Sequence, residues 1–351
     1  MKIAIIGSGF FGIACAIELS GQNNIHLFEK QEDILQQASK KNQFRFHLGY
    51  HYPRSDLTVK EIKKSNVLFK NFYNILNFEK TNNFYAIAKK KSKTNLKKFL
   101  DFTKKNNLPL RRIPNTQNIY RSDFYLSKET NLNYFHFKNY VKKVLKKNKK
   151  IKIFLKSNFN RSLLQSYDVV IVCCYSNNNK VLKSLGVKKI KKLKYELIEK
   201  IIIKLPKKFK NKSYVILDGK FVCVDPYLGT SYHLLSDVKY SKLEVVKSIL
   251  PNFKSKYKKY INSGLVKIKN NKNFSNFINH SKNYLPFLKD ASYVGSFFVV
   301  RTLSLNKNSI LKDERLNNLI SYGKIISVLS GKWNTSVWMA KKINLFLKNR
   351  F

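Results

Sequence analysis

Hydrophobic and polar positions follow two different patterns along this chain. In the first half, short apolar runs at residues 3–6, 25–28 and 167–174 are separated by stretches with helical spacing. Such runs are typical of strands buried on both faces of a parallel sheet. From residue 195 onward apolar and polar residues alternate more regularly, as in antiparallel strands. The pattern predicts an α/β chain, α+β overall, with a Rossmann-like parallel sheet and a second, mostly antiparallel sheet.

The individual elements follow from the same pattern and from turn residues. Expected strands cover residues 3–6, 25–28, 83–88, 151–155, 167–174, 196–204, 213–217, 221–224, 231–235 and 293–302. Expected helices cover 11–19, 56–76, 94–105, 134–145, 242–250, 253–261 and a last helix that ends near residue 347, with a polar helix-like segment at 31–38. Residues 108–133 are expected to be irregular, and Asp218-Gly219 is expected to form a two-residue hairpin turn.

A glycine motif follows the first expected strand. Gly7, Gly9 and Gly12 form G-x-G-x-x-G, in which the first glycine allows a tight turn. The second lets a diphosphate approach the backbone, and the third lets the helix pack against the strand. Phe10 and Phe11 open this helix, whose first N–H groups attract anions. The motif predicts a dinucleotide site, the alternative being an ordinary glycine-rich turn.

The second strand ends in an acidic residue. Glu29 lies about 20 residues past the glycines, where a carboxylate can accept a hydrogen bond from a ribose hydroxyl. Lys30 follows it as a further candidate for cofactor contact. Tyr175 comes after the expected strand 167–174, and ligands gather at the carboxyl ends of parallel strands. The motif alone does not choose between FAD and NAD.

Residues 38–55 combine functional side chains with chain-breaking residues. Arg45, His47 and His51 lie around Gly49 and Pro53, which is unsuited to a plain helix or strand. A neutral imidazole can accept a proton near working pH, so both histidines are catalytic candidates. The alternative for each is a hydrogen-bonded core histidine.

Two features near the carboxyl terminus are also candidates. Arg301 lies in an apolar strand, where its charge must pair with a carboxylate of the substrate or of the protein. The turn that opens the last helix can present N–H groups to a cofactor, and its candidate residues are Gly331, Lys332, Trp333, Asn334 and Thr335. The alternative for the turn is an ordinary helix start.

The net charge is strongly positive. The 351 residues include 69 Lys and Arg against 20 Asp and Glu, which gives +49. Such a charge indicates either an affinity for nucleic acid or anionic membranes, or a compositional bias. We favour the bias because the lysines are spread along the chain. We therefore expect no specific nucleic-acid partner, and at most peripheral contact with anionic surfaces.

The remaining composition indicates a cytoplasmic chain. Four cysteines without a C-x-x-C pair predict buried free thiols in a reducing compartment, and no metal site is expected. No signal peptide and no apolar run long enough to cross a bilayer is visible.

Four blocks together resemble the FAD-dependent oxidoreductases of the D-amino-acid-oxidase superfamily, including glycine and sarcosine oxidases. They are GSGFFGIACAIEL with LFEK, NQFRFHLGYHYPRS, DVVIVCCYSN and SGKWNTSVWMA, and the Arg45–Ser55 block with the hairpin DGKFVCVDP is similar to uncharacterised bacterial members. The resemblance implies FAD as the cofactor, with the Arg45–Arg54 loop over the flavin ring and with Arg45 and His47 as candidate cofactor contacts. It also implies a discontinuous FAD-binding domain (1–80, 134–190 and 286–351) and a substrate domain (81–133 and 191–285).

The expected function is an FAD-dependent oxidation of a C–N or C–O bond in a small anionic metabolite or nucleotide sugar, by hydride transfer to flavin N5. Two alternatives stay open. One is a flavin enzyme without net redox chemistry, such as a sugar-ring mutase. The other is a basic nucleotide- or nucleic-acid-binding protein.

Overall fold

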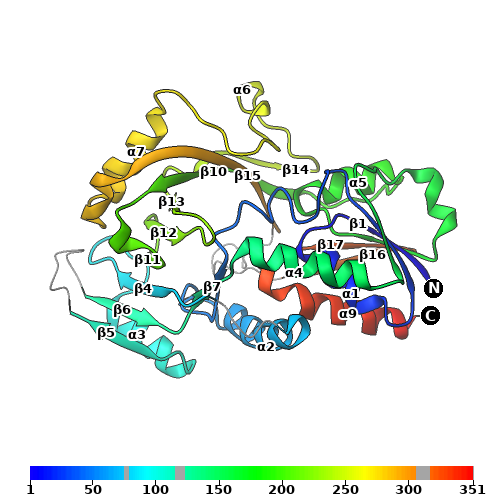
Figure 1. Ribbon diagram of the computed structural model, residues 1–351, viewed down its shortest axis with the longest axis horizontal. Coiled ribbons are helices and arrows are strands. Elements are labelled where there is room, and N and C mark those ends of the chain that lie inside the picture. Colours follow the sequence, from blue (N-terminus) through cyan, green and yellow to red (C-terminus); the bar gives the residue numbers. More distant parts are fainter. Residues whose placement is uncertain (75–78, 115–122, 306–316, 351) are drawn as a thin grey trace.

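A six-stranded sheet forms one end of the molecule (Figure 1). The computed structural model describes residues 1–74, 79–114, 123–305 and 317–350. The strand order is β16–β17–β9–β1–β2–β8, and every pair is parallel except β16 with β17. These strands are β1 (Lys2–Ile6), β2 (Asn24–Phe28), β8 (Ile151–Phe154), β9 (Val169–Val172), β16 (Asn318–Tyr322) and β17 (Ile325–Leu329).

Helices cover both faces of this sheet, which explains its uniformly apolar strands. Ile3 and Ile5 belong to one core with α1 (Phe10–Leu19), α4 (Tyr134–Lys147) and α9 (Ser336–Lys348), whereas Ala4 and Ile6 pack on the other face with α5 (Asn178–Ser184). The predicted strand–glycine turn–helix unit and the parallel sheet are confirmed.

A larger sheet of nine strands fills the other half of the described structure. Its order is β14–β10–β13–β12–β11–β4–β6–β5, with β15 on the free side of β10. All its pairs are antiparallel except β4 with β11. The strands are β4 (Asn82–Ile87), β5 (Leu110–Ile113), β6 (Phe124–Ser127), β10 (Leu193–Lys204), β11 (Lys212–Leu217), β12 (Val222–Pro226), β13 (Tyr232–Asp237), β14 (Lys242–Ser248) and β15 (Ser292–Leu303).

The two faces of the larger sheet differ in chemistry. Ile201 and Ile203 pack with Phe277 of α7 (Lys272–Ser281) in one apolar core. Ile202 points the other way and joins the core of the first sheet. Because side chains alternate along a strand, Glu196 and Lys200 share the face of Ile202. We call this face, which is turned toward the first sheet, the inner face.

Smaller elements connect the two sheets. β3 (Arg45–Phe46) pairs with β7 (Thr130–Asn131), and α2 (Asp56–Tyr73) packs on α9. Ser55 caps α2, since its side chain accepts a hydrogen bond from Thr58 N. The remaining helices are α3 (Leu96–Lys105) and α6 (Ser255–Lys258), with a 3-10 turn at Trp333–Thr335. Among the residues described, no helix has the length and apolar character to cross a bilayer.

Several predicted elements are wrong. Residues 31–38 form no helix, and Leu35 and Gln37 there have positive φ. Residues 242–250 contain strand β14, and 253–261 contain only the four-residue α6. Residues 108–133 hold β5, β6 and β7 in their described parts.

Three further predictions need adjustment. Helix α2 ends at Tyr73, and the end predicted at residue 76 lies outside the described residues. The hairpin at Asp218-Gly219 is present, but residues 218–221 separate its strands, so it is not a two-residue turn. The boundary predicted at residue 286 assigns β15 to the FAD-binding domain, whereas β15 pairs with β10 in the larger sheet.

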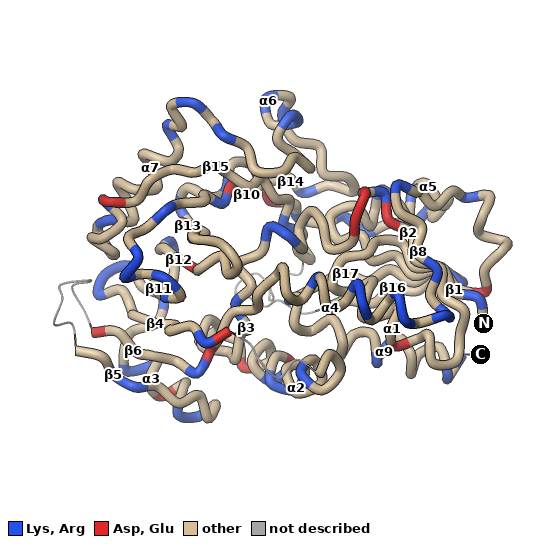
Figure 2. The backbone as a smooth tube through the Cα atoms, viewed as in Figure 1, with Lys and Arg blue, Asp and Glu red and all other residues tan. Residues whose placement is uncertain are grey.

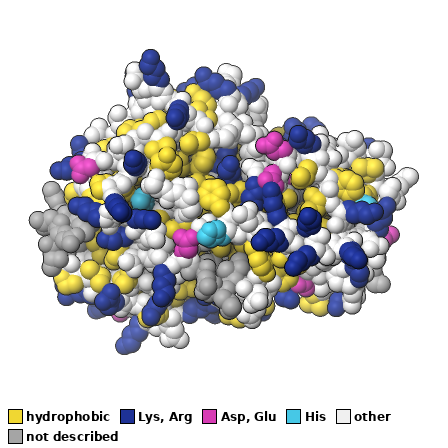
Figure 3. Space-filling view, viewed as in Figure 1, with side chains coloured by type: hydrophobic (Ala, Val, Ile, Leu, Met, Phe, Trp, Pro, Cys, Tyr) yellow, Lys and Arg dark blue, Asp and Glu magenta, His cyan; other side chains and the backbone are white. Residues whose placement is uncertain are grey.

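The positive charge is spread over the whole molecule. Lys and Arg occur in nearly every element of the tube in Figure 2. They are scattered across the face shown in Figure 3 among hydrophobic and neutral side chains. The arrangement agrees with a compositional bias.

Candidate functional site

The glycine turn is shaped by close backbone approaches. Gly7 has φ +99, and a Cβ there would lie 2.7 Å from the carbonyl oxygen of Cys173. A Cβ on Gly12 would lie 1.8 Å from the carbonyl oxygen of Gly7, so only glycine lets α1 begin here. Gly9 is the N-cap of α1, and no side chain caps this helix end. The start of α1 thus lacks the side-chain cap that α2 and α4 have, which suits an anion.

Glu29 lies beside this turn. One carboxylate oxygen accepts hydrogen bonds from the N–H and the hydroxyl of Ser8, both at 2.9 Å, and the other accepts from Gln31 N at 2.9 Å. A carboxylate has about four lone-pair positions, so one remains for a ribose hydroxyl. Lys30 follows at the surface. The Cys174 thiol lies 3.2 Å from the Ile6 carbonyl oxygen, and burial raises its pKa to about 12.

The start of α1 meets the carboxyl-terminal turn. The rings of Phe10 and Trp333 have centroids 5.2 Å apart, and Phe46 lies 5.7 Å from Trp333. Lys332 Nζ lies 4.9 Å above the Tyr52 ring. The structure therefore brings together three segments that are far apart in the sequence. Phe11 is buried in the same core.

The carboxyl-terminal turn is only partly available to a ligand. The N–H of Gly331 donates to Asn317 Oδ1 at 2.7 Å, and the Thr335 hydroxyl lies 3.0 Å from the same oxygen and 2.6 Å from the Lys332 carbonyl. Asn334 donates from Nδ2 to Asn66 Oδ1 at 2.7 Å. Among the described residues, the buried Asn334 Oδ1 and Ser336 Oγ have no hydrogen-bond partner. Buried polar atoms are normally paired, so these two atoms fit a bound polar group.

His47 and His51 lie side by side in the residue 47–52 loop. Their ring centroids are 5.5 Å apart, and Tyr52 lies 5.7 Å from His47. Burial, followed by the charges of Lys332, His51 and Arg45, lowers the pKa of His47 well below its usual value. His47 is therefore neutral at physiological pH and can accept a proton or a hydrogen bond.

The side chain of Arg45, predicted to touch the cofactor, is closed inside the protein instead. It is 2% exposed, and its guanidinium donates to Asp225 at 2.5 Å, to Ser213, and more distantly to Tyr85 and Glu129. Burial lowers its pKa, but the nearby carboxylates outweigh burial and raise the pKa above its usual value. With both Nη atoms bonded to protein groups and the side chain buried, the structure gives no support to a cofactor contact of Arg45.

Arg301 pairs with a carboxylate of the protein, one of the two alternatives that the sequence left open. Its Nε donates to Glu196 Oε2 at 2.7 Å, and Lys194 Nζ lies 2.9 Å from Glu196 Oε1. Burial raises the pKa of Glu196, but Arg301 and Lys194 outweigh it and hold this pKa at about 2. The Arg301 side chain is 31% exposed. In the described part of the chain its Nη1 makes no hydrogen bond.

Two lysines near this pair were missed by the sequence analysis. Lys200 Nζ donates to the Lys41 carbonyl at 2.9 Å, and Lys41 Nζ donates to the Phe298 carbonyl at 3.2 Å. Neither ammonium has a carboxylate within 4.0 Å among the described residues. Burial lowers the pKa of both to about 8. The spacing of Glu196 and Lys200 on one face of β10 was the available signal.

The candidate Tyr175 and a buried histidine of the large sheet, His233, both have structural partners. The Tyr175 hydroxyl accepts from Thr302 N at 3.1 Å, which links the first sheet to β15. His233 Nε2 lies 3.1 Å from the Phe209 carbonyl and is 4% exposed. Its neighbour Leu235 belongs to the apolar core with Phe277, so His233 lies on the face turned away from the glycine turn.

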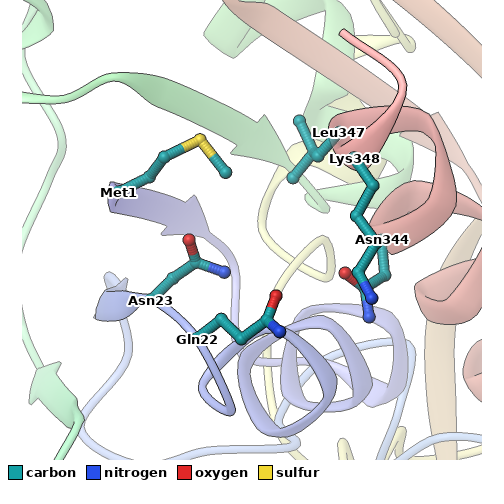
Figure 4. A pocket seen from close by; sticks show the side chains of 6 residues that line it. All are labelled: Met1, Gln22, Asn23, Asn344, Leu347 and Lys348. Carbon is teal, nitrogen blue, oxygen red and sulfur yellow. The ribbon is translucent and has the colours of Figure 1, made fainter. Parts of the chain in front are cut away.

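A pocket near the chain termini lies elsewhere (Figure 4). Its lining comes from the start of β1, the α1–β2 connection and the end of α9, namely Met1, Gln22, Asn23, Asn344, Leu347 and Lys348. It therefore opens at the amino edge of the parallel sheet, opposite the glycine turn.

Comparisons with known proteins agree with this geometry. Residues 2–123 match the family model described as "FAD dependent oxidoreductase". The FAD-dependent monooxygenase FPY4 of Fusarium mangiferae is 34% identical over 87 residues, which is 24% of either chain, so the chain matches about a quarter of this relative.

Two solved structures are similar over nearly the whole chain. Glycine oxidase from Geobacillus kaustophilus has a TM-score of 0.70 at 11% identity, covering 98% of this chain and 94% of that one. The dithionite-reduced L-α-glycerophosphate oxidase from Mycoplasma pneumoniae with FAD bound has a TM-score of 0.70 at 13% identity, covering 97% and 93%. At such identities the likeness concerns the fold.

Proposed function

We propose that this chain is an FAD-dependent oxidoreductase of the D-amino-acid-oxidase superfamily, as the family match over residues 2–123 supports, and that it oxidises a C–N or C–O bond of a small anionic metabolite or nucleotide sugar. The observation that carries the proposal is the meeting of Phe10, Tyr52 and the Lys332-Trp333 turn. The start of α1, the residue 47–52 loop and the carboxyl-terminal turn can then hold one extended cofactor.

The residues around the glycine turn fit FAD. The uncapped N-terminus of α1 and the close backbone at Gly7 and Gly12 suit a diphosphate, and Glu29 keeps a lone pair for a ribose hydroxyl. Asn334 Oδ1 and Ser336 Oγ offer buried polar atoms for the remaining part of the cofactor. When bound, FAD would supply the acceptor for one hydride, which carries both electrons of the oxidation.

The inner face of the large sheet favours an anionic substrate. Lys41, Lys200 and the open edge of Arg301 together carry more positive charge than Glu196 can balance. A buried or partly buried ammonium without a carboxylate is costly, and a bound anion offsets that cost. A carboxylate or phosphate of the substrate is the ligand that suits these donors.

His47 is the candidate proton acceptor. Its pKa is lowered by burial and by neighbouring cations, so its ring is neutral when the substrate arrives. Oxidation of an alcohol or amine releases a proton from oxygen or nitrogen, and a neutral imidazole in the same site can take it. His51 lies close enough to help orient the substrate or to pass the proton on.

The first test is the colour and bleaching of the purified protein. We expect bound flavin, and we expect its absorbance to bleach anaerobically with one member of a panel of amino acids, hydroxy acids and nucleotide sugars. Gly12→Val should lose the flavin, because its Cβ would clash with the Gly7 carbonyl. Gly21→Ala is the matched control, since a Cβ there meets nothing within 4 Å.

Other outcomes would favour the alternatives. Turnover only after dithionite reduction would indicate a flavin enzyme without net redox chemistry. A colourless protein that binds nucleic acid with a steep salt dependence would indicate a basic binding protein and would overturn the proposed function.

A further inference from the structure

We propose that Glu129 is the positioning residue for His47, holding the imidazole proton on Nδ1 so that Nε2 can accept a proton from the substrate. The proposal rests on the proposed function for the identity of that proton. It concerns a residue between β6 and β7 that carries no recognisable sequence signal.

The two carboxylate oxygens of Glu129 contact different parts of the structure: Oε1 faces the residue 47–52 loop, and Oε2 faces Tyr85 of the large sheet and Arg45. Oε1 accepts from Leu48 N at 2.8 Å and lies 3.8 Å from His47 Nδ1. Oε2 accepts from the Tyr85 hydroxyl at 2.5 Å and lies 3.5 Å from an Arg45 nitrogen. The Glu129 side chain is fully buried, at 0% exposure. Three contacts, with Leu48, Tyr85 and Arg45, therefore hold this carboxylate beside the imidazole.

The backbone of His47 is fixed from both sides. On one side, β3 pairs with β7, with Phe46 opposite Thr130, which brings the loop to Glu129. On the other side, Asn66 Nδ2 donates to the His47 carbonyl at 2.7 Å. These contacts hold the backbone of His47 so that its imidazole lies beside Glu129.

The charges around His47 select one tautomer. A neutral histidine carries one N–H and one lone pair. Nδ1 is buried without a hydrogen-bond partner in the described structure, and Glu129 is the carboxylate that faces it. A carboxylate attracts an N–H and repels a lone pair, so the Nδ1–H form should be in about tenfold excess. The lone pair is then on Nε2.

The other groups around His47 keep the ring neutral. Lys332 comes from the carboxyl-terminal turn and Arg45 from β3, and both cations oppose an imidazolium. His51 and Tyr52 lie in the same loop, with ring centroids within 5.7 Å of His47. Arg45 is nearer to Asp225, at 2.5 Å, than to Glu129, at 3.5 Å, so the field of Glu129 remains directed at His47.

The test is nitrogen-15 NMR of the histidine rings in the flavin-loaded protein. His47→Asn assigns the signal by removing it. We expect the wild-type His47 ring to be protonated at Nδ1, and Glu129→Gln to reduce the tautomer excess about tenfold. Glu199→Gln is the matched control. Glu199 is another buried glutamate, but it bonds Asn271, Asn273 and Ser296 far from His47, so the His47 signal should stay unchanged.

A second readout is the pH dependence of kcat/KM. Removing a carboxylate lowers the pKa of a nearby histidine, so the acid limb should move to lower pH in Glu129→Gln and stay in place in Glu199→Gln. Glu129→Asp keeps the negative charge, so it should recover part of the kcat/KM that Glu129→Gln loses.

Three results would overturn the proposal: a wild-type ring protonated at Nε2, an unchanged tautomer in Glu129→Gln, or an unchanged acid limb. The wild-type spectrum decides even if Glu129→Gln does not fold. Failure to bleach with any substrate would count against the proposed function instead, because the tautomer is measured without turnover.

Discussion

Arg45 and Arg301 make opposite uses of the same side chain on the inner face of the large sheet. Arg45 enters from β3, is 2% exposed and bonds groups of five different sheet or loop residues. Arg301 belongs to β15, is 31% exposed and, within the part of the chain that the structure describes, bonds a single carboxylate, Glu196. A buried guanidinium bonded to several protein groups stabilises the fold, whereas a partly exposed one with an open edge can still bind a ligand.

The carboxylates around the two arginines also differ, in how much positive charge surrounds them. We call the groups around Arg45 the first cluster and those around Arg301 the second cluster. Glu129 and Asp225 share the single cation Arg45, and burial raises the pKa of Glu129. Glu196 has Arg301 and Lys194 around it, and its pKa is lowered to about 2. The first cluster is short of positive charge and the second has an excess, so an anion is expected only at the second.

The largest expected effect is on stability, from Arg45→Ala. Removing the guanidinium leaves Asp225 and Glu129 buried without their cation, which should cost about 3–5 kcal/mol of unfolding free energy. Urea unfolding at pH 7 measures this. Exposed Arg111→Ala is the control, with a change within about 0.5 kcal/mol. A loss below about 1 kcal/mol for Arg45→Ala would mean that the closed cluster does not hold the fold.

Arg301→Ala should act on substrate binding instead. Loss of a charged hydrogen bond to the substrate anion should raise KM about 10- to 150-fold, while flavin content stays the same. Stability should change by only about 1 kcal/mol, because Lys194 remains beside Glu196 at 2.9 Å. Steady-state kinetics with unfolding of the same sample separates the two effects. An unchanged KM with a large loss of stability would make Arg301 a structural residue like Arg45.

The two glutamates should give opposite pH responses. The pKa of Glu196 is lower in the folded state than the unfolded value near 4.5, so its stabilisation is present above pH 4.5 and is lost as the pH falls toward 2. Glu196→Gln should remove an acid loss of the order of 2 kcal/mol. The raised pKa of Glu129 has the opposite sign, so the folded state gains stability as pH falls through that pKa toward 4.5. Unfolding curves of Glu196→Gln and Glu129→Gln between pH 2 and 7 measure these two responses. If both substitutions changed the pH dependence of the unfolding free energy in the same direction, the comparison would be contradicted.

The parallel sheet and the glycine turn are predictable because local signals agree there. Residues 3–6 are apolar throughout, and the glycines follow at once. Residues 242–250 are misassigned as a helix because their mixed pattern suits either structure, and pairing of Glu196 with Val245 across β10 and β14 decides for a strand. Long-range pairing is information that a local pattern lacks.

The charged clusters are harder to predict for the same reason. Arg45 and Asp225 are 180 positions apart, and Leu48 and Glu129 are 81 apart. Arg45 is recognisable as important from its motif, but its partners are not, so its role is misread as cofactor contact. Glu129 lies in a stretch predicted as irregular. Lys200 was missed although a local signal existed, because its spacing of two positions from Ile198 and four from Glu196 places all three on one face of a strand.

The smallest expected effect comes from Lys200→Met, which keeps the length of the side chain and removes its charge. The folded pKa of about 8 lies below the usual 10.5, so the unfolded state binds more protons between these values, and wild-type stability rises from pH 8 toward 10.5. The Lys200→Met protein lacks this pH dependence of stability. It should be more stable than the wild type by about 1 kcal/mol at pH 7, a small gain because the Lys200 side chain keeps partial contact with solvent.

If Lys200 binds the substrate anion, KM of Lys200→Met should still rise about 5- to 10-fold, in the range of a weak charged contact. A gain in stability with an unchanged KM would confine the anion contact to Arg301, and a loss of stability would mean that the ammonium is satisfied by the protein after all.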